Sequence, residues 1–589
     1  MKKGLLLARS LFLLGTATVR AQAFFSTYKA TFLDELSAYL NSGTSKQDRD
    51  EAAVMMQSLN EVWNTYYGSQ DAATVIRLCE LYHAKSGSRA YANIFNFTEL
   101  VLRVPASGLS HQDVSNWLSY TESKAQKSMN GMEKYLASCR SIFVEKTLSA
   151  KGNSKWTLRE AKIGFPSKDE FRLTANGVLA LSSQKDESVI KQTQGTYFLD
   201  DNRWEGSGGR ADWSRFGISP EKVYVMLPEH YKLDLSRSEY AIDSVVFYEK
   251  QYFQEDIVGR YEDKVLVNAP NEKTMFPRVK SYRSDYVIPN ILKNVEFEGG
   301  IGMMGNQVDV FGGVENKAVF KFRQHQHEVV RVEAKRFVMS MEELLVSDHV
   351  SLCVFVTDTI GADMAMDSIY HNDLGFRYDN HTRTMMLYRA EQDHGYAAAP
   401  FHDQFHGMDI FLEAMYWNID GNVIDFRRME GVNPRSEGDL YSVSYFRNED
   451  FEMLRGLDGT HPMIRLEKFL KSNYGENPNL FYVADFAAYL NFPIEQVISM
   501  LLRLQSKGYV DYYADTRTAL ALPRFFDVIE SSRENIDFDV ITFHTVTNDR
   551  QPNCRLDLNT NDLLVFGITS QIDGVDGSAI SLRDRKSVV

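Results

Sequence analysis

The stretch Ala318–Arg323 (AVFKFR) alternates apolar and polar side chains with a period of two residues. Such alternation is typical of a β-strand that buries one face and leaves the other in water. The same pattern, rich in aromatic and β-branched residues, recurs from Trp156 to about Glu449 between turns marked by Gly or Asn-Asp. We therefore predict a large β-rich domain over residues 153–449.

Two parts of this domain are similar to each other. Tyr240–Tyr248 (YAIDSVVFY) leads into Lys264–Val267. Met366–His371 (MDSIYH) leads into Phe376–Asp379 and Thr384–Arg389. Both contain Asp-Ser followed by Val or Ile before a pair of strands, which favours stacked rungs that bury their apolar faces against each other. We expect a β-solenoid or a stacked β-jelly-roll-like region, with an irregular pair of β-sandwiches as the alternative.

Towards the N-terminus the repeat changes to three and four residues, which is the period of an α-helix. Met55, Leu59 and Trp63 form one such apolar stripe, and Ser110 with Asp113 forms a near capping box before another. Breaks rich in Ser and Gly separate five or six such stretches. We predict a helical domain over residues 24–152, built of short helices in antiparallel hairpins.

A second helical unit is predicted within the β pattern, over residues 450–532. Three helices and a hairpin that turns at Ala514-Asp515 are expected, at Met463–Tyr474, Val483–Leu490, Pro493–Lys507 and Tyr509–Leu522. This order resembles a winged helix-turn-helix over residues 463–522. Acidic side chains slightly outnumber basic ones there, whereas phosphate contact needs a basic face. A scaffold or protein-contact role is therefore expected rather than DNA binding.

The first 23 residues have the three parts of a secretory signal peptide. Lys2, Lys3 and Arg9 supply the positive start, Ser10–Val19 is a short apolar run, and Ala21–Ala23 (AQA) fits a cleavage site. A first helix of the folded domain is the alternative. The apolar run is shorter than the roughly 20 residues that cross a bilayer, and no later stretch is long and apolar enough. We expect export to the periplasm or outer cell surface, with no transmembrane span.

Strand-like alternation resumes over residues 533–583, with Phe538–His544 as an example. The last six residues, Asp584–Val589 (DRKSVV), match the translation of a common sequencing adapter. We therefore expect the natural sequence to be truncated near Arg583, inside a strand-like stretch, and the chain to be the front part of a longer protein.

The net charge of −14 favours solubility and disfavours nucleic acid as a partner. The four cysteines are too few for a disulfide framework and include no CxxC pair that would suit zinc. Cys79 and Cys139 both fall in the helical domain, where a disulfide and two buried free thiols are both open alternatives.

Histidines and carboxylates gather in one stretch of the β domain. They are His371, His381, His394, His402 and His406, beside Asp393, Asp403, Asp409 and Glu413. On a helix, His402 and His406 would share a face with Asp409 nearby, which suits zinc. Pro400 before them and strand-like alternation over Met408–Trp417 argue against a helix, and no HExxH motif is present. His402, His406 and Asp409 are the candidate metal ligands, and we expect no metal and no other cofactor.

Two further motifs receive structural interpretations. Gly300–Gly305 (GIGMMG) matches GxGxxG, but a dinucleotide fingerprint must open a helix, and Asn306–Phe311 is strand-like. A turn between strands is expected there. His325 and His327 are expected on one solvated strand face, together with Lys321.

Five short phrases are spread over most of the chain. They are Gly208–Trp213 (GGRADW), Phe297–Gly300 (FEGG), Asp367–Tyr370 (DSIY), Phe376–Asp379 (FRYD) and Tyr509–Tyr512 (YVDY). Together they resemble a family of very long, secreted, uncharacterised proteins of Gram-negative gut-type bacteria. The resemblance brings no known catalytic residues, and it agrees with export and with the expected truncation.

The sequence thus predicts a multidomain α+β protein of the cell envelope, with a structural or binding role and no assembled catalytic site. A periplasmic lipid or lipopolysaccharide conduit is one alternative, because Phe376–Asp379 and Met386–Tyr388 resemble strands of conduit-type open β-jelly-rolls. A β-helical polysaccharide-acting enzyme is another, with carboxylates such as Asp200 and Asp201 on one face, although Asp201-Asn202 favours a turn. Envelope proteins, glycans or lipids are the expected partners.

Overall fold

The computed structural model describes residues 23–582 with internal gaps. The gaps fall at 44, 254, 266–274, 315, 325–326, 341–343, 357–367, 390–398, 430–434, 456–460, 473–476, 515, 540, 549–550 and 570–577. The predicted signal peptide before Ala23, the adapter-like tail Asp584–Val589, and the residues Asp393 and His394 therefore lie outside the described residues.

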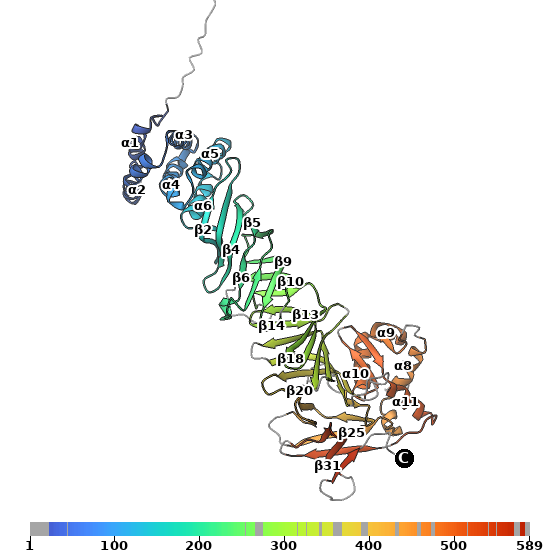
Figure 1. Cartoon of the computed structure of the whole chain (residues 1–589). Coiled ribbons are helices and arrows are strands. Elements are labelled where there is room, and N and C mark those ends of the chain that lie inside the picture. The colour runs from blue at the N-terminus through green and yellow to red at the C-terminus, as the bar shows by residue number, and fades with distance from the viewer. Residues whose placement is uncertain are drawn as a thin grey trace, which may run out of the picture. The chain divides into compact units, whose positions relative to one another are not determined.

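An N-terminal helical region is followed by a large antiparallel β-sheet (Figure 1). The chain divides into two compact units. The first comprises Met1–Ala211, Met226–Ala241 and Lys264–Ala269, and the second comprises Asp212–Val225, Ile242–Asp263 and Pro270–Val589. Four strands run over a boundary between these stretches, namely β6 (Arg210–Asp212), β7 (Val223–Met226), β9 (Glu239–Glu249) and β10 (Ile257–Lys264).

Six α-helices open the first unit, as the helical periodicity predicts. They are α1 (Lys29–Leu40), α2 (Lys46–Thr65), α3 (Ser69–Lys85), α4 (Ala90–Arg103), α5 (His111–Lys127) and α6 (Met132–Phe143). The stripe on α2 buries Met55, Leu59 and Trp63, and neighbouring helices pack on it. A complete capping box starts α5: the Ser110 hydroxyl accepts from the Asp113 N–H, and the Asp113 carboxylate accepts from the Ser110 N–H.

An antiparallel sheet completes the first unit. Its strands pair in the order β1 (Thr147–Lys151), β2 (Ser154–Gly164), β3 (Arg172–Ser182), β4 (Glu187–Phe198), β5 (Arg203–Ser207) and β8 (Tyr231–Asp234). Glycines let aromatic rings lie flat against its backbone. A Cβ at Gly195 would stand 2.3 Å from the Trp204 ring, and one at Gly206 would stand 2.2 Å from the Tyr231 ring.

The later strands of the second unit form two antiparallel ladders. Ladder A pairs β12 (Tyr286–Leu292), β13 (Val295–Met304), β15 (Ala318–Gln324), β16 (His327–Ala334), β18 (Leu344–Phe355), β19 (Ser368–Asp379), β21 (Phe401–Asp403), β22 (Met408–Phe411), β25 (Ser436–Ser442), β29 (Thr542–Thr547) and β31 (Asp562–Ile568). Ladder B pairs β11 (Arg278–Ser281), β13, β14 (Gln307–Phe311), β17 (Arg336–Ser340), β18, β19, β20 (Thr384–Tyr388), β23 (Ala414–Asn418), β24 (Val423–Arg427), β30 (Cys554–Asp557), β31 and β32 (Ser578–Leu582).

Four long strands belong to both ladders. In β13, residues 295–298 pair with β15 of ladder A and residues 300–304 pair with β14 of ladder B. The strands β18, β19 and β31 change ladders in the same way. The register of β18 shifts between Ser347 and Val350, so a bulge lies where this strand passes from one ladder to the other. Each crossing strand therefore ties the two ladders together.

The space between the ladders is filled with aromatic rings. Three ring pairs join ladder A to ladder B with centroids 4.8–5.3 Å apart: Phe320 with Phe337, Phe322 with Tyr378, and Phe401 with Phe426. All six side chains have no exposed surface. On the outer face, cross-strand ion pairs such as Arg323–Glu296 and Arg555–Asp425 alternate with these inward residues.

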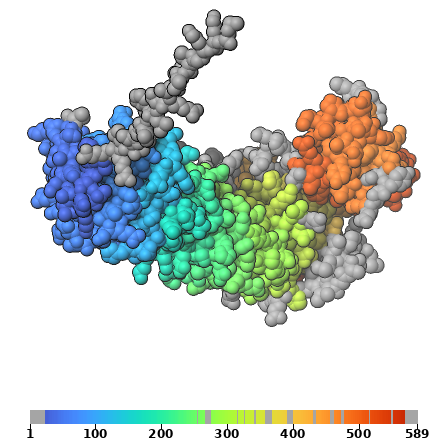
Figure 2. All heavy atoms as spheres, turned by 90° about the horizontal axis from the view of Figure 1, so that it is seen from above, coloured from blue at the N-terminus to red at the C-terminus, as the bar shows by residue number. Residues whose placement is uncertain are grey.

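A helical insert, residues 446–533, stands between β25 and β29. Its elements are α7 (Asn448–Glu452), α8 (Pro462–Leu470), β26 (Leu480–Tyr482), α9 (Val483–Leu490), α10 (Ile494–Gln505), β27 (Val510–Tyr513), β28 (Thr518–Ala521) and α11 (Pro523–Ser532). They surround a hydrophobic core of their own that includes Phe486, Val497 and Phe525. In Figure 2 these residues, coloured orange to red, form a compact lobe.

The structure corrects three sequence interpretations. Gly300 and Gly302 lie inside β13 and not in a turn. Glycine is needed there because a Cβ at Gly300 would meet the Phe311 ring and a Cβ at Gly302 would meet the Val279 carbonyl oxygen. The third glycine, Gly305, does occupy the turn, with φ +57.

The other two corrections concern strand continuity. His327 opens β16, where it pairs with Gln324 of β15, so it lies on a different strand from Lys321. His325 itself is outside the described residues. Met408–Trp417 is not one strand: it divides into β22 in ladder A and β23 in ladder B.

All four cysteines are free thiols, and Cys79 and Cys139 are buried in α3 and α6 without pairing. Burial raises the pKa of both thiols. Among the described residues, no helix combines the length and the apolar character needed to cross a bilayer.

Candidate functional site

Strand register brings Tyr370, His402 and Asp409 into one row. Tyr370 of β19 faces His402 of β21, and His402 faces Asp409 of β22. Side chains directly opposite in antiparallel strands meet, since their Cβ atoms are about 5 Å apart. The His402 Nδ1 atom lies 2.7 Å from Asp409 Oδ1, and the His402 ring stacks on Tyr370 with centroids 4.9 Å apart.

Two residues of the insert reach this row. Arg524, in the first turn of α11, pairs through Nη1 with Asp409 Oδ2. Asp511 of β27 accepts a hydrogen bond from the Asn372 amide of β19. The side chains of Arg524 and Asp409 are 10% and 1% exposed, so their ion pair is shielded from water. We call Tyr370, Asn372, His402, Asp409, Asp511 and Arg524 the polar cluster.

Burial sets the protonation states in the polar cluster. The pKa of His402 is lowered to about 4, mainly by burial, while the charge of Asp511 opposes this shift and the charge of Arg524 adds to it. A neutral His402 donates its Nδ1–H to Asp409, which leaves Nε2 without a proton and, among the described residues, without a hydrogen-bond partner. Burial also lowers the pKa of Arg524 to about 10 and raises the pKa of Asp511. Arg524 therefore stays a cation at neutral pH.

A second histidine–carboxylate pair lies close by in sequence. His406 Nδ1 is 2.6 Å from Asp403 Oδ2, and the His406 backbone N–H donates to Oδ1 of the same carboxylate. His406 Nε2 lies 2.8 Å from the carbonyl oxygen of Asn561, between β30 and β31. Burial alone would lower the pKa of His406, but the hydrogen bond and charge of Asp403 outweigh it and the pKa is raised. This pair fastens the β21–β22 hairpin to the β30–β31 hairpin.

His371 is fully buried and neutral. Its Nε2 atom lies 3.1 Å from the Ala399 carbonyl oxygen, and its Nδ1 accepts from the Asp373 N–H. Burial lowers its pKa to about 3. The remaining candidates lie apart: His381 is in an exposed turn, and Glu413 pairs with Arg428 and accepts from the Met429 N–H.

The candidate metal ligands His402, His406 and Asp409 are placed on a hairpin, not on a helix. His402 and Asp409 hold each other, whereas both ring nitrogens of His406 are engaged by Asp403 and Asn561. Within the part of the chain that the structure describes, no group of three His, Cys, Asp or Glu side chains could hold a metal ion.

Asp409 orients His402 as a carboxylate orients the histidine of a general base, with Nε2 unprotonated. Its surroundings are closed. His402 is 8% exposed. Gly508 packs against its ring so closely that a Cβ added at Gly508 would lie 3.2 Å from His402 Cε1. The contact that joins the sheet to the insert is the one between Asp409 and Arg524, whose charges compensate each other in the interior.

The sequence indicated His402 and Asp409 but missed Arg524 and Asp511. A signal for Arg524 was present. It follows Pro523 at a helix start, where the helix dipole disfavours a cation, so an anionic partner nearby would offset that cost. The signal for Asp511 is weaker: it is a carboxylate among the apolar and aromatic residues of Tyr509–Tyr513.

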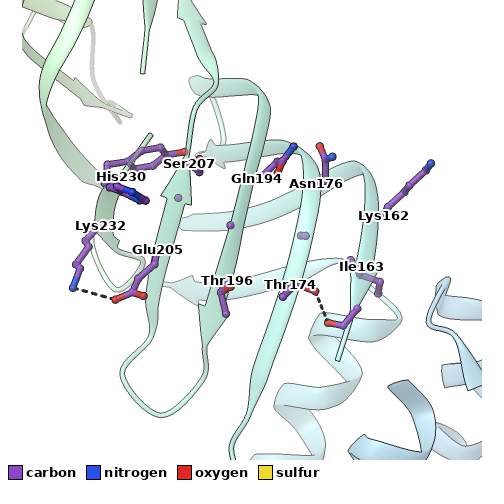
Figure 3. Close-up of a pocket in the computed structure, with 15 residues that line it drawn as sticks. Lys162, Ile163, Thr174, Asn176, Gln194, Thr196, Glu205, Ser207, His230 and Lys232 are labelled. Atoms are coloured by element: carbon purple, nitrogen blue, oxygen red, sulfur yellow. Dashed lines mark hydrogen bonds and ion pairs between the residues drawn. The ribbon is translucent and has the colours of Figure 1, made fainter. Parts of the chain in front are cut away.

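A groove of about 810 Å³ crosses β2, β3, β4, β5 and β8 on the sheet of the first unit (Figure 3). Asn176, Gln194 and Thr196 line it with amide and hydroxyl groups. Glu205 at its margin pairs with Lys232 at 3.1 Å. The groove therefore offers hydrogen bonds but not the largely apolar walls of a small-molecule site. Asp200 and Asp201 are outside it, in the β4–β5 turn, where Asp201 pairs with Arg203.

Comparison with known proteins finds no matching family model, no matching curated protein and no matching solved structure.

Proposed function

We propose that this chain is an exported cell-envelope protein with a structural or binding role, related to the very long secreted proteins that its short phrases resemble. In this proposal the β region is a solid scaffold, and the insert is a contact module fastened to it. Export is inferred from the signal-peptide pattern of residues 1–23.

The observation that carries the scaffold role is the filled interior between the ladders. Ring pairs such as Phe320–Phe337 and Phe401–Phe426 close the space from both sides. Cores packed in this way are stiff and resist deformation. The crossing strands β13, β18 and β19 add covalent continuity from one ladder to the other. Both properties suit a protein that holds position or bears load.

A lipid conduit is our second candidate, and the same ring contacts count against it. A conduit needs an apolar lumen wide enough for acyl chains. Between β13 and β24 such a lumen would require the Phe322–Tyr378 and Phe401–Phe426 contacts to separate. A polysaccharide-acting enzyme ranks third, because the buried carboxylates Asp409 and Asp511 are engaged by Arg524 and Asn372.

At the level of fold, we propose that the ladders are stacked rungs of a solenoid-like or jelly-roll-like kind, and that the insert is winged-helix-like. The order α8, α9, α10 and then the β27–β28 hairpin supports the second proposal. The insert binds protein rather than DNA in this proposal, since α10 opens with Glu495 and carries one basic side chain, Arg503.

Fractionation and native mass spectrometry test the proposal. The expected result is a periplasmic or surface-exposed polypeptide that begins at Phe24 and carries no lipid. Retention of Met1 with a cytoplasmic location would refute export. Stoichiometric lipid on the purified chain would favour the conduit, and turnover of a glycan panel would favour the enzyme.

A further inference from the structure

The described chain enters the helical domain through a carboxylate of α3. The Phe24 N–H donates to Glu80 Oε1 at 3.1 Å, and the Phe25 N–H donates to Glu80 Oε2 at 3.0 Å. One carboxylate thus binds two successive backbone nitrogens. Phe24 and Phe25 precede α1 and belong to no helix or strand. The two bonds to Glu80 therefore hold the start of the described chain against α3.

Aromatic packing holds Phe24 and Phe25 against α1 and α3. Phe25 is 1% exposed and packs on Phe32 and Tyr39 of α1, with centroids 5.6 and 5.8 Å apart. The Phe24 ring stacks on His83 of α3 at 3.9 Å. Phe25 is therefore anchored in the core before the chain reaches α1, and the half-exposed Phe24 ring rests on α3, which keeps the Phe24 nitrogen beside Glu80.

The predicted signal-peptide cleavage site ends at Ala23, directly before this nitrogen. Hydrolysis of the Ala23–Phe24 bond adds the hydroxyl of water to the Ala23 carbonyl carbon and a proton to the Phe24 nitrogen. The released Ala23 acid ionises, and the new amine takes up a proton at neutral pH. Cleavage thus places a positive charge at the atom that already lies 3.1 Å from Glu80.

We infer that Glu80 is the receptor for the α-ammonium group that cleavage creates at Phe24, so that processing completes the fold of the helical domain. This inference rests on the proposed export and cleavage. A neutral amide donor becomes a charged one, and charge-assisted hydrogen bonds are roughly twice as strong. The other titratable groups that face this segment are His83 of α3 and Tyr39 and Glu35 of α1.

The pairing predicts a pH dependence. The pKa of an α-amino group in an unfolded chain is about 8. Pairing with Glu80 raises the folded pKa above that value. The stabilisation is therefore fully present below pH ~8 and is lost as the pH rises through the raised pKa.

Amine reactivity tests the inference on the full mature chain. One form begins at Phe24 and another at Ala23, each released from a removable fusion. Acylation of the terminal amine is measured by peptide mass from pH 6 to pH 10, and each rate is divided by the rate of the same form in denaturant. We expect the Phe24 form to react about threefold to tenfold more slowly at pH 7 than the Ala23 form, with a raised midpoint.

Two variants locate the effect. Glu80→Gln should abolish the slow reaction, whereas Glu122→Gln, which removes the exposed Arg77–Glu122 pair, should preserve it. Equal relative rates for the Phe24 and Ala23 forms overturn the inference even if Glu80→Gln fails to fold. N-terminal sequencing of the exported protein is a separate readout: a start at another residue refutes cleavage at Ala23, whereas the amine rates decide the role of Glu80.

Discussion

Replacing Arg524 by Met should release the insert from the sheet. The side chains of Arg524 and Asp409 are 10% and 1% exposed. Solvent screening limits the contribution of a surface ion pair to stability to about 0–1 kcal/mol, but this limit does not apply to a buried pair. Removing one partner of a buried pair leaves an uncompensated charge and costs about 3–5 kcal/mol. Met retains much of the apolar length of Arg, so the loss reports the missing charge more than a cavity.

Hydrogen exchange of peptides from α8 to α11 measures this loss. At about 1.4 kcal/mol per tenfold, protection in the insert should fall by a factor on the order of 10²–10³. The double variant Asp409→Asn with Arg524→Met should recover part of it. Arg336→Met is the matched control: it removes a pair whose arginine is 40% exposed and should change exchange by less than about tenfold. A change below tenfold in Arg524→Met would refute the interpretation of the polar cluster.

Three further predictions concern the core, the histidines and the first unit. Phe320→Ala should cost about 3–5 kcal/mol and lower the denaturant midpoint of the second unit, whereas an unchanged midpoint would contradict a filled interior. Acidification from pH 6.5 to 4 should weaken the hydrogen-exchange protection of β19 and β21. The folded pKa values of His371 and His402, about 3 and about 4, lie below the pKa of an unfolded histidine. The stability that the two neutral rings contribute is therefore present above the unfolded pKa and is lost as the pH falls. Increased protection on acidification would contradict this. Gly206→Ala should cost about 1–3 kcal/mol in the first unit, measured as a lower melting temperature, since its Cβ would stand 2.2 Å from the Tyr231 ring. A neutral result would contradict the close packing there.

Local patterns predicted the helices well. The helix Val483–Leu490 has the bounds that its apolar stripe predicts, and the capping box of Ser110 and Asp113 is present in both directions. Both features depend on residues three to seven positions apart. Strands such as β15 followed from two-residue alternation for the same reason.

Long-range register could not be predicted in the same way. The sequence placed His402 and Asp409 in one stretch, but their contact depends on the β21–β22 pairing. Arg524 lies more than a hundred residues further along the chain and reaches Asp409 only after the insert folds. Glycine is a turn signal, so the sequence predicts a turn at Gly300 and Gly302, whereas in the structure these glycines make room for Phe311 and for a neighbouring strand.

The strands that belong to both ladders restrict how such a chain can change its length. Side chains alternate with a period of two, so one residue inserted within β13, β18 or β19 would turn the following side chains over in both ladders. An insertion in the turn between β23 and β24 reverses nothing. Length differences between relatives should therefore collect in hairpin loops or come as whole hairpins added between crossings. Each crossing strand thus sets the facing of the side chains in two ladders at once.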